Sequence, residues 1–261
     1  MHILVLMKMT PDVVEELEIA PDGKGLDLDA VRMSLSESDD HALEEALLLK
    51  ERHGGAVTVL ALDAPEVDDA LYTALAKGAD RAVKIAGVDA GFPTSQAALA
   101  LSRAIVRVSG LWPADLMLTG VQAIDDLDGL IAPMVAHELD LPYVGIVTRL
   151  SLDASGRTAL ATKEYPGGVR GEFEIALPAV LGIQAAEKPP RYVPVAKVRS
   201  AMRTQKIDCT PVSLLADGGY AAVQVVEMKR NEPAGHAEML DGSPESVSDK
   251  LCGILAGHGL L

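Results

Sequence analysis

The sequence predicts an α/β fold with a doubly wound, mostly parallel sheet, added antiparallel strands and an extended C-terminal arm. Short β-rich runs alternate with longer helical patterns over most of the chain, which is typical of a doubly wound sheet. Of the 261 residues, 49% are hydrophobic but only 3% are aromatic. The core must therefore be aliphatic, which suits parallel strands covered by Ala- and Leu-rich helices.

The first part of the chain carries the regular alternation. Apolar runs predict strands at residues 3–7, 56–62, 81–85 and 116–118. Apolar residues at helical spacing predict helices that begin at Ser36 and that cover residues 66–77, 95–108 and 130–139. Ser36 and the acids after it are typical of a helix start, and Gly78 is typical of a helix end.

From residue 143 the pattern changes to strands and turns. We expect strands at residues 144–152, 158–164, 169–176 and 179–183, and we interpret them as added antiparallel strands. An extended loop at 189–195, a basic helix at 196–206 and an amphipathic segment at 244–256 follow. We therefore divide the chain into an α/β nucleotide-binding domain (1–187) and a docking loop with a C-terminal arm (188–261), whose unburied face suggests a partner chain.

Composition and missing motifs exclude several functions. The formal net charge of -15 disfavours nucleic acid and anionic membrane surfaces as partners. Cys209 and Cys252 are too few for a disulfide framework and are expected to be reduced, and the six histidines show no metal-ligand spacing. The chain lacks a leader, a membrane span, a glycine-rich dinucleotide turn and a Walker A loop, so we expect a cytoplasmic protein without a catalytic or metal site.

The most informative stretch joins the strand at 116–118 to the helix at 130–139. The strand runs into Gly120, and an acidic loop with Asp125, Asp126, Asp128 and Gly129 follows. At the carboxyl end of a parallel strand, free backbone N–H groups and a helix dipole receive phosphate groups. The loop contains no lysine or arginine, so the main chain would bind the phosphate and catalytic phosphoryl transfer is disfavoured.

Seven short motifs in order resemble the beta subunit of electron transfer flavoproteins over nearly the whole chain. They are Leu4-Val5-Leu6-Met7-Lys8, the run 40–46 with Glu44-Glu45-Ala46, the run 73–81, Gly120 with Gln122-Ala123-Ile124-Asp125-Asp126, Glu164-Tyr165-Pro166-Gly167-Gly168, Leu177-Pro178-Ala179-Val180 and Pro190-Arg191-Tyr192. A single motif would not be specific, whereas seven in the right order are.

The resemblance implies an electron carrier, not an enzyme. A larger alpha subunit would hold most of the redox FAD at the junction of the two chains, and electrons would pass from flavin dehydrogenases to a membrane quinone oxidoreductase. The beta subunit would hold AMP in a structural role. The positions that match its nucleotide pocket are Leu6, Met7, Lys8, Ser36, Glu37, Ser38, Asp39, Asp63, Gly120, Gln122, Ala123, Ile124, Asp125, Asp126, Asp128, Gly129, Leu130 and Ile131.

The resemblance also implies a docking surface for dehydrogenases. It consists of the loop with Arg191 and Tyr192 and of the following helix, with an apolar anchor at Val195; Glu164 would pair with an arginine of the alpha subunit. Simpler interpretations remain open: Arg191 and Tyr192 can staple a loop, and Val195 can be an ordinary exposed aliphatic residue.

The loop departs from the common AMP-binding pattern. The Asn, Gln and Thr residues that contact phosphate in the common pattern are missing from this chain. At the entry of the first helix, Ser36-Glu37 replaces Asn-Pro, and Asp63 replaces an apolar residue at a strand end. Residues 131–133 are closer to the electron-bifurcating branch, in which a second FAD replaces AMP. The alternatives are therefore a bifurcating subunit that oxidises NADH within its complex, or a stand-alone adenine-nucleotide-binding regulatory protein, which would not need the long C-terminal segment.

Overall fold

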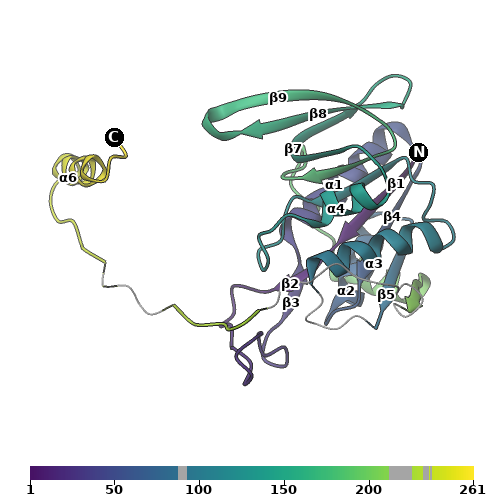
Figure 1. Ribbon diagram of the computed structural model, residues 1–261, viewed down its shortest axis with the longest axis horizontal. Helices are drawn as coiled ribbons and strands as arrows, with labels where there is room; N and C mark the ends of the chain where they lie inside the picture. The colour runs from purple at the N-terminus through teal and green to yellow at the C-terminus, as the bar shows by residue number, and fades with distance from the viewer. Residues whose placement is uncertain (88–92, 212–224, 232–234, 236) are drawn as a thin grey trace. The chain divides into compact units, whose positions relative to one another are not determined.

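The computed structural model describes residues 1–87, 93–211, 225–231, 235 and 237–261. The chain forms two compact units, Met1–Glu227 and Met228–Leu261. Among the described residues, the first unit contains both sheets and helices α1 to α5, and the second contains α6, which Figure 1 labels near the C-terminus. The first unit therefore includes residues 188–211, which we had grouped with the C-terminal arm.

A nine-stranded, mostly parallel sheet forms the centre of the first unit. Its strands are β1 (His2–Met7), β4 (Ala56–Leu62), β5 (Arg81–Ala86), β6 (Leu116–Gly120), β7 (Tyr143–Leu152), β8 (Thr158–Tyr165), β9 (Val169–Ala176), β10 (Ala179–Ile183) and β11 (Ile207–Pro211), in the order β11-β5-β4-β1-β6-β10-β7-β8-β9. The four strands expected in the first part are present, and the doubly wound α/β prediction is confirmed.

Helices cover both faces of this sheet. They are α1 (Glu37–His53), α2 (Val67–Lys77), α3 (Thr94–Arg107) and α4 (Ile131–Glu138). Alternate residues of β1 point to opposite faces: Val5 packs in one aliphatic cluster with α1 and α2, and Leu6 packs in another with α3 and α4. The chain therefore builds two cores, one on each side of the sheet.

The order of the strands places a switch point beside β1. The chain moves from β1 through α1 to β4 on one side and returns through α3 to β6 on the other side. Both neighbours are parallel to β1, so the carboxyl ends of β1, β4 and β6 meet at one edge. Open α/β sheets bind ligands in the crevice at such a point.

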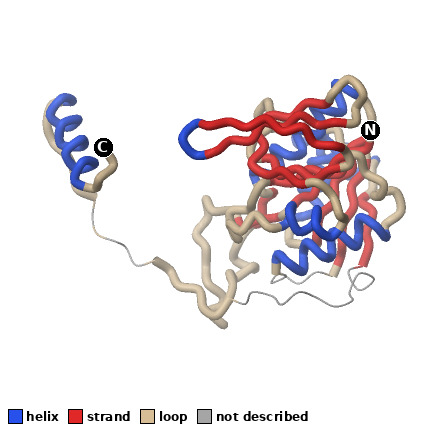
Figure 2. The backbone as a smooth tube through the Cα atoms, turned by 45° about the horizontal axis from the view of Figure 1, so that its top comes forward, coloured by secondary structure: helices blue, strands red, loops and turns tan. Residues whose placement is uncertain are grey.

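The strand at 179–183 corrects one prediction. We had interpreted it as an added antiparallel strand, but β10 lies between β6 and β7 and is parallel to both. All five of its residues are buried, as expected for an internal parallel strand covered on both faces. Only β8 and β9 extend the sheet in antiparallel fashion, as a long hairpin closed by the short helix η1 (Pro166–Gly168) (Figure 2).

The segment after residue 188 also differs from expectation. The basic helix α5 spans Val195–Thr204, shorter than the 196–206 we predicted, because the chain then extends into β11 at the edge of the sheet. β11 pairs in parallel with β5, starting from Ile207 opposite Ala82. A second, small antiparallel sheet joins β2 (Met9–Pro11) to β3 (Met33–Leu35). Neither β11 nor this small sheet was predicted.

The second unit contains α6 (Pro244–Gly257), close to the amphipathic segment expected at 244–256. The Ser243 hydroxyl caps it by accepting the N–H of Ser246 at 3.3 Å. None of its residues is buried, and Leu251 and Ile254 are 46% and 44% exposed. Among the helices of the described residues, none has the length and apolar character needed to cross a membrane.

Candidate functional site

A cavity lies at the switch point, where β1, β4 and β6 end. Fourteen of the eighteen predicted nucleotide-site residues line it: Leu6, Met7, Lys8, Asp39, Asp63, Gly120, Gln122, Ala123, Asp125, Asp126, Asp128, Gly129, Leu130 and Ile131. The fold therefore brings together four segments that are far apart in the sequence: 6–8, Asp39, Asp63 and 120–131. Because backbone N–H groups at strand ends and several charged side chains line this cavity, it is the candidate ligand site.

Four predicted residues lie outside the lining. Ser36 is buried, and its hydroxyl lies 3.2 Å from that of Ser38. The Ser38 hydroxyl donates to the Gln122 carbonyl at 2.7 Å, so it ties the start of α1 to the acidic loop. Glu37 and Ile124 are exposed. Neither serine belongs to the lining of the cavity; their contacts hold the start of α1 against the loop that does line it.

Sequence reasoning missed two sides of the cavity, one of which is formed by Thr94, Ala97 and Leu101 of α3. Met9, Leu28 and Met33 line it from the segment that contains β2 and β3, and Ala64 and Pro65 line it after β4. Ala64 and Pro65 directly follow the predicted Asp63, so their place at a strand end could have identified them. Leu28 and Met33 lie in a region without periodic pattern, and no sequence signal placed them here.

Asp39, in the first turn of α1, connects the two central strand ends. Its carboxylate accepts the N–H of Lys8 at 2.8 Å and the N–H of Gly120 at 2.6 Å. The residue is 6% exposed. Burial raises the pKa of Asp39 to about 7, although both N–H bonds and the nearby Lys8 charge act in the opposite direction. Through these two hydrogen bonds the Asp39 carboxylate links the end of β1 to the end of β6 at the cavity, an arrangement that we call the Asp39 clasp.

The clasp requires glycine at position 120. A Cβ at this position would lie 2.1 Å from Ser38 Oγ and 2.7 Å from Asp39 Oδ1. It would also lie 2.8 Å from the Asp39 backbone nitrogen, which cannot rotate away. Gly120 is therefore needed for close approach of α1 and not for an unusual backbone angle.

The acidic loop receives its counter-charge from β1. Lys8 Nζ lies 2.7 Å from Asp125 Oδ1 and 2.5 Å from Asp126 Oδ2. Burial lowers the pKa of Lys8, but its two aspartate partners raise it by more, so the net shift is upward. The absence of basic residues within the loop is thus compensated by a lysine that is more than a hundred residues away in sequence.

The acidic loop ends at the amino end of α4. Gly129 takes a left-handed conformation with φ +60, and the Asp128 carboxylate accepts the N–H of Leu130 at 3.0 Å. The first N–H groups of an α-helix have no partner within the helix, and its dipole favours an anion there. Leu130 and Ile131 line the cavity at this helix start. The Leu130 N–H is bonded to Asp128, so Ile131 and Ala132 carry the main-chain N–H groups that have no partner within the helix.

Asp63 is occupied by other partners. Its carboxylate lies 3.5 Å from Lys84 Nζ and accepts a long bond of 3.4 Å from the N–H of Gly87. Lys84 also pairs with Asp68 at 2.7 Å, and these two acids raise the pKa of Lys84. The negative charge that was unexpected in a phosphate pocket is therefore balanced locally. Within the described residues, no three His, Cys, Asp or Glu side chains are grouped as a metal site.

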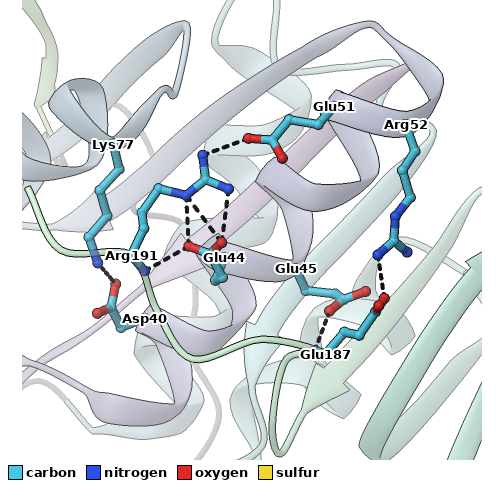
Figure 3. Close-up of polar contacts among 8 residues, drawn as sticks. All are labelled: Asp40, Glu44, Glu45, Glu51, Arg52, Lys77, Glu187 and Arg191. Atoms are coloured by element: carbon cyan, nitrogen blue, oxygen red, sulfur yellow. Dashed lines mark hydrogen bonds and ion pairs between the residues drawn. The ribbon is translucent and has the colours of Figure 1, made fainter.

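The four predicted docking residues lie in two other places. Arg191 is not free: its guanidinium forms hydrogen bonds with Glu44 and Glu51 of α1 (Figure 3). Tyr192 and Val195 are 84% and 61% exposed. Glu164 lies on β8 and pairs with Arg170 of β9 at 2.9 Å. Two of the four predicted docking side chains thus have internal ion-pair partners.

Comparison with known proteins agrees with this arrangement. A family model described as the electron transfer flavoprotein domain matches residues 26–214. The chain is 31% identical to the electron transfer flavoprotein subunit beta of Methylophilus methylotrophus, over 98% of both chains. It is 29% identical to the subunit of the same name from Bacillus subtilis (strain 168), over 98% of this chain and 97% of the relative. Protein FixA of Azorhizobium caulinodans is 31% identical over 79% of this chain and 74% of its own length.

Proposed function

Because the chain belongs to the electron transfer flavoprotein beta-subunit family, we propose that it pairs with an alpha subunit, shares the redox FAD with it, and holds AMP in its own cavity. In this proposal the chain carries electrons from flavin dehydrogenases to a quinone oxidoreductase. One observation carries the nucleotide assignment: fourteen predicted pocket positions line a single cavity at the switch point.

The charges of the cavity support an orientation for the nucleotide. The N–H groups of Lys8 and Gly120 are already bonded to Asp39, so a phosphate would compete there with a buried carboxylate. At the amino end of α4 the Leu130 N–H is bonded to Asp128 and Pro133 has no N–H, but the N–H groups of Ile131 and Ala132 have no partner within the helix. We therefore place the phosphate at residues 129–131 and the adenosine toward the apolar wall with Met9, Leu28 and Met33.

The surface of the chain supports a partner subunit. The second unit has no buried residue in α6, and its Leu251 and Ile254 are exposed. The hairpin also exposes apolar side chains, among them Tyr165 at 40% and Val169 at 60%. Exposed apolar groups on two separate segments are typical of an interface that a partner chain covers.

The experiment is a cofactor count on the complex. The chain is co-expressed with an electron transfer flavoprotein alpha subunit from the same genome, and the FAD and AMP released on denaturation are measured per heterodimer. We expect one of each. A chain that purifies alone with an adenine nucleotide and without any flavin partner would contradict the electron-carrier proposal.

A charge variant tests the phosphate position. Leu130 is the N-cap of α4 and is 45% exposed. Leu130→Asp suits a helix start but places a negative charge next to the proposed phosphate, so we expect at least a tenfold loss of bound AMP with FAD unchanged. Leu130→Asn is the matched control because it has the same shape without the charge, and it should keep AMP.

A second candidate is the bifurcating form, in which FAD replaces AMP. The observation in its favour is Ile131-Ala132-Pro133, which forms the first turn of α4 and resembles the loop end of that branch. The same cofactor count separates the two: two FAD and no AMP per heterodimer, with reduction by NADH, would establish the bifurcating form.

A further inference from the structure

We infer that α1 is a template that fixes the backbone of residues 186–191, and that Arg191 is a positioning residue of this template and not a contact to the partner. The inference deepens the proposed docking function, because the fixed segment leads directly into Tyr192 and Val195. Its structural part is independent of that function, since it rests on contacts within the first unit.

Three side chains of α1 hold the main chain of this segment. His41 Nδ1 accepts the N–H of Ala186 at 3.2 Å, and Glu45 Oε2 accepts the N–H of Glu187 at 2.9 Å. Glu44 Oε2 accepts the N–H of Arg191, also at 2.9 Å. Two adjacent glutamates therefore fix backbone groups four residues apart, which sets the path of the loop between them.

Side-chain ion pairs lock the same segment. The Arg191 guanidinium donates through Nε and Nη2 to both oxygens of Glu44, at 2.8 to 3.1 Å, and through Nη1 to Glu51 at 2.7 Å. Arg52 pairs with Glu187 (Figure 3). A forked guanidinium–carboxylate pair is among the strongest and most directional contacts of a folded chain.

The burial of Glu44 explains why Arg191 stays in place. The Glu44 side chain is 4% exposed and that of Arg191 is 29% exposed. If the guanidinium turned outward to meet a partner, a buried carboxylate would lose its cation, which is unfavourable. Arg191 correspondingly lowers the pKa of Glu44, against the effect of burial.

The segment held by α1 leads into two exposed side chains, Tyr192 and Val195, which lie next to basic residues of α5 in the sequence. Tyr192 follows Arg191 directly, and α5 begins at Val195 and is anchored by its buried Ala201. The exposed Lys197, Arg199 and Arg203 lie on the same helix. The geometry fits a partner with an apolar cleft and an acidic rim. Arg191 contributes only by holding the backbone that carries Tyr192 and Val195.

Hydrogen exchange on the full-length chain, with its alpha subunit where the two copurify, tests the template. In Glu44→Gln we expect the amides of Ala186, Glu187, Lys188 and Arg191 to exchange at least tenfold faster, and chymotrypsin to cleave after Tyr192 correspondingly faster. Arg191→Lys should show the same changes, because it keeps the charge but loses the fork. Glu51→Gln is the control, since Glu51 is 56% exposed and should matter little. Unchanged exchange in both Glu44→Gln and Arg191→Lys would overturn the inference.

A double-mutant cycle then distinguishes positioning from contact. The probe is a flavin dehydrogenase from the same genome that reduces the wild-type heterodimer. We expect Glu44→Gln and Arg191→Gln each to raise the KM for the heterodimer about tenfold with kcat and AMP content retained, and the double variant to add nothing. An unchanged KM in Glu44→Gln together with a raised KM in Arg191→Gln would make Arg191 a contact. If no dehydrogenase reduces the wild type, the proposed function fails, and the exchange result still decides the template.

Discussion

Helix α1 carries three buried carboxylates that accept backbone N–H groups from distant segments, and two of them, Asp39 and Glu44, differ in charge partner. Asp39 bridges Lys8 and Gly120 at the cavity floor, and burial raises its pKa to about 7. Glu44 accepts the N–H of Arg191 and also the Arg191 guanidinium, and its pKa is lowered despite burial. A direct cation partner therefore decides the sign of the shift.

A neighbouring residue supports this comparison. Glu45 is 1% exposed and accepts one N–H, from Glu187, but has no direct ion pair. Burial raises its pKa, as it does for Asp39. The acid at the cavity end of α1 therefore has a pKa that burial raises to about 7. At the loop end, burial raises the pKa of Glu45, and the Arg191 guanidinium lowers that of Glu44.

The largest expected effect is a loss of folding stability in Gly120→Ala, which disrupts the Asp39 site by steric clash. Gly120→Ala would place a Cβ against Ser38 Oγ and the Asp39 backbone, and should cost about 4 kcal/mol by overpacking and by loss of the clasp. Urea unfolding measures this cost. Gly25→Ala is the control, because nothing lies within 4 Å of a Cβ there, and it should change stability by less than about 0.5 kcal/mol. Equal effects at both positions would refute the close approach.

The pH dependence of stability sharpens the comparison. The contribution of Asp39 is full below its unfolded pKa near 3.8 and is lost as the pH rises through about 7. The contribution of Glu44 has the opposite sign: it is present above its unfolded pKa near 4.5 and is lost as the pH falls. The Lys8 ammonium beside Asp39 stays charged throughout this range, because the pKa of Lys8 is raised above its ordinary value of 10.5.

Asp39→Asn and Glu44→Gln test these opposite slopes. Asp39→Asn should remove a decline of about 3 kcal/mol between pH 4 and 7, because an amide does not titrate. Glu44→Gln should leave that decline in place and remove only the loss at lower pH. Urea unfolding at a series of pH values is the measurement. Burial also raises the pKa of Glu45, so part of the decline should remain in Asp39→Asn. A decline of undiminished size would assign the whole titration to another group.

A smaller effect concerns the acidic loop next to the clasp. Lys8→Gln leaves Asp125 and Asp126 without their shared cation, so they repel each other and any phosphate nearby. We expect a stability loss of about 1 kcal/mol, modest because Lys8 is partly exposed, and about tenfold weaker AMP binding by calorimetry. Lys50→Gln is the matched control: it removes the same charge from a pair with Asp80 outside the cavity and should leave AMP affinity unchanged.

The fold was largely predictable from local pattern, and its exceptions have physical causes. β10 was expected to be antiparallel because it lies in the strand-and-turn pattern after residue 143, yet its unbroken apolar run Ala179–Ile183 already has the character of an internal parallel strand. β11 is a short edge strand with polar residues at Asp208 and Thr210, and nothing in its sequence distinguishes it from a loop.

The site was predictable in position but not in its contacts. The strand ends and the loop 120–131 were identified from glycine and charge, because chain direction alone brings parallel strand ends together. The pairing of Lys8 with Asp125 and of Glu44 with Arg191 depends on residues 117 and 147 positions apart. Such distances are set by tertiary packing, so a single sequence contains no signal for them.

The smallest expected effect contrasts an exposed ion pair with the buried one. Glu164 and Arg170 are 42% and 68% exposed across the hairpin, so Glu164→Gln should change the free energy of unfolding by less than about 0.5 kcal/mol, far less than a change at Glu44. Because the pair contributes so little to folding, any loss of electron transfer in Glu164→Gln would reflect a contact outside this chain. Glu172→Gln on β9 is the matched control, and a fall in electron-transfer rate confined to Glu164→Gln, at unchanged stability, would locate that contact at Glu164.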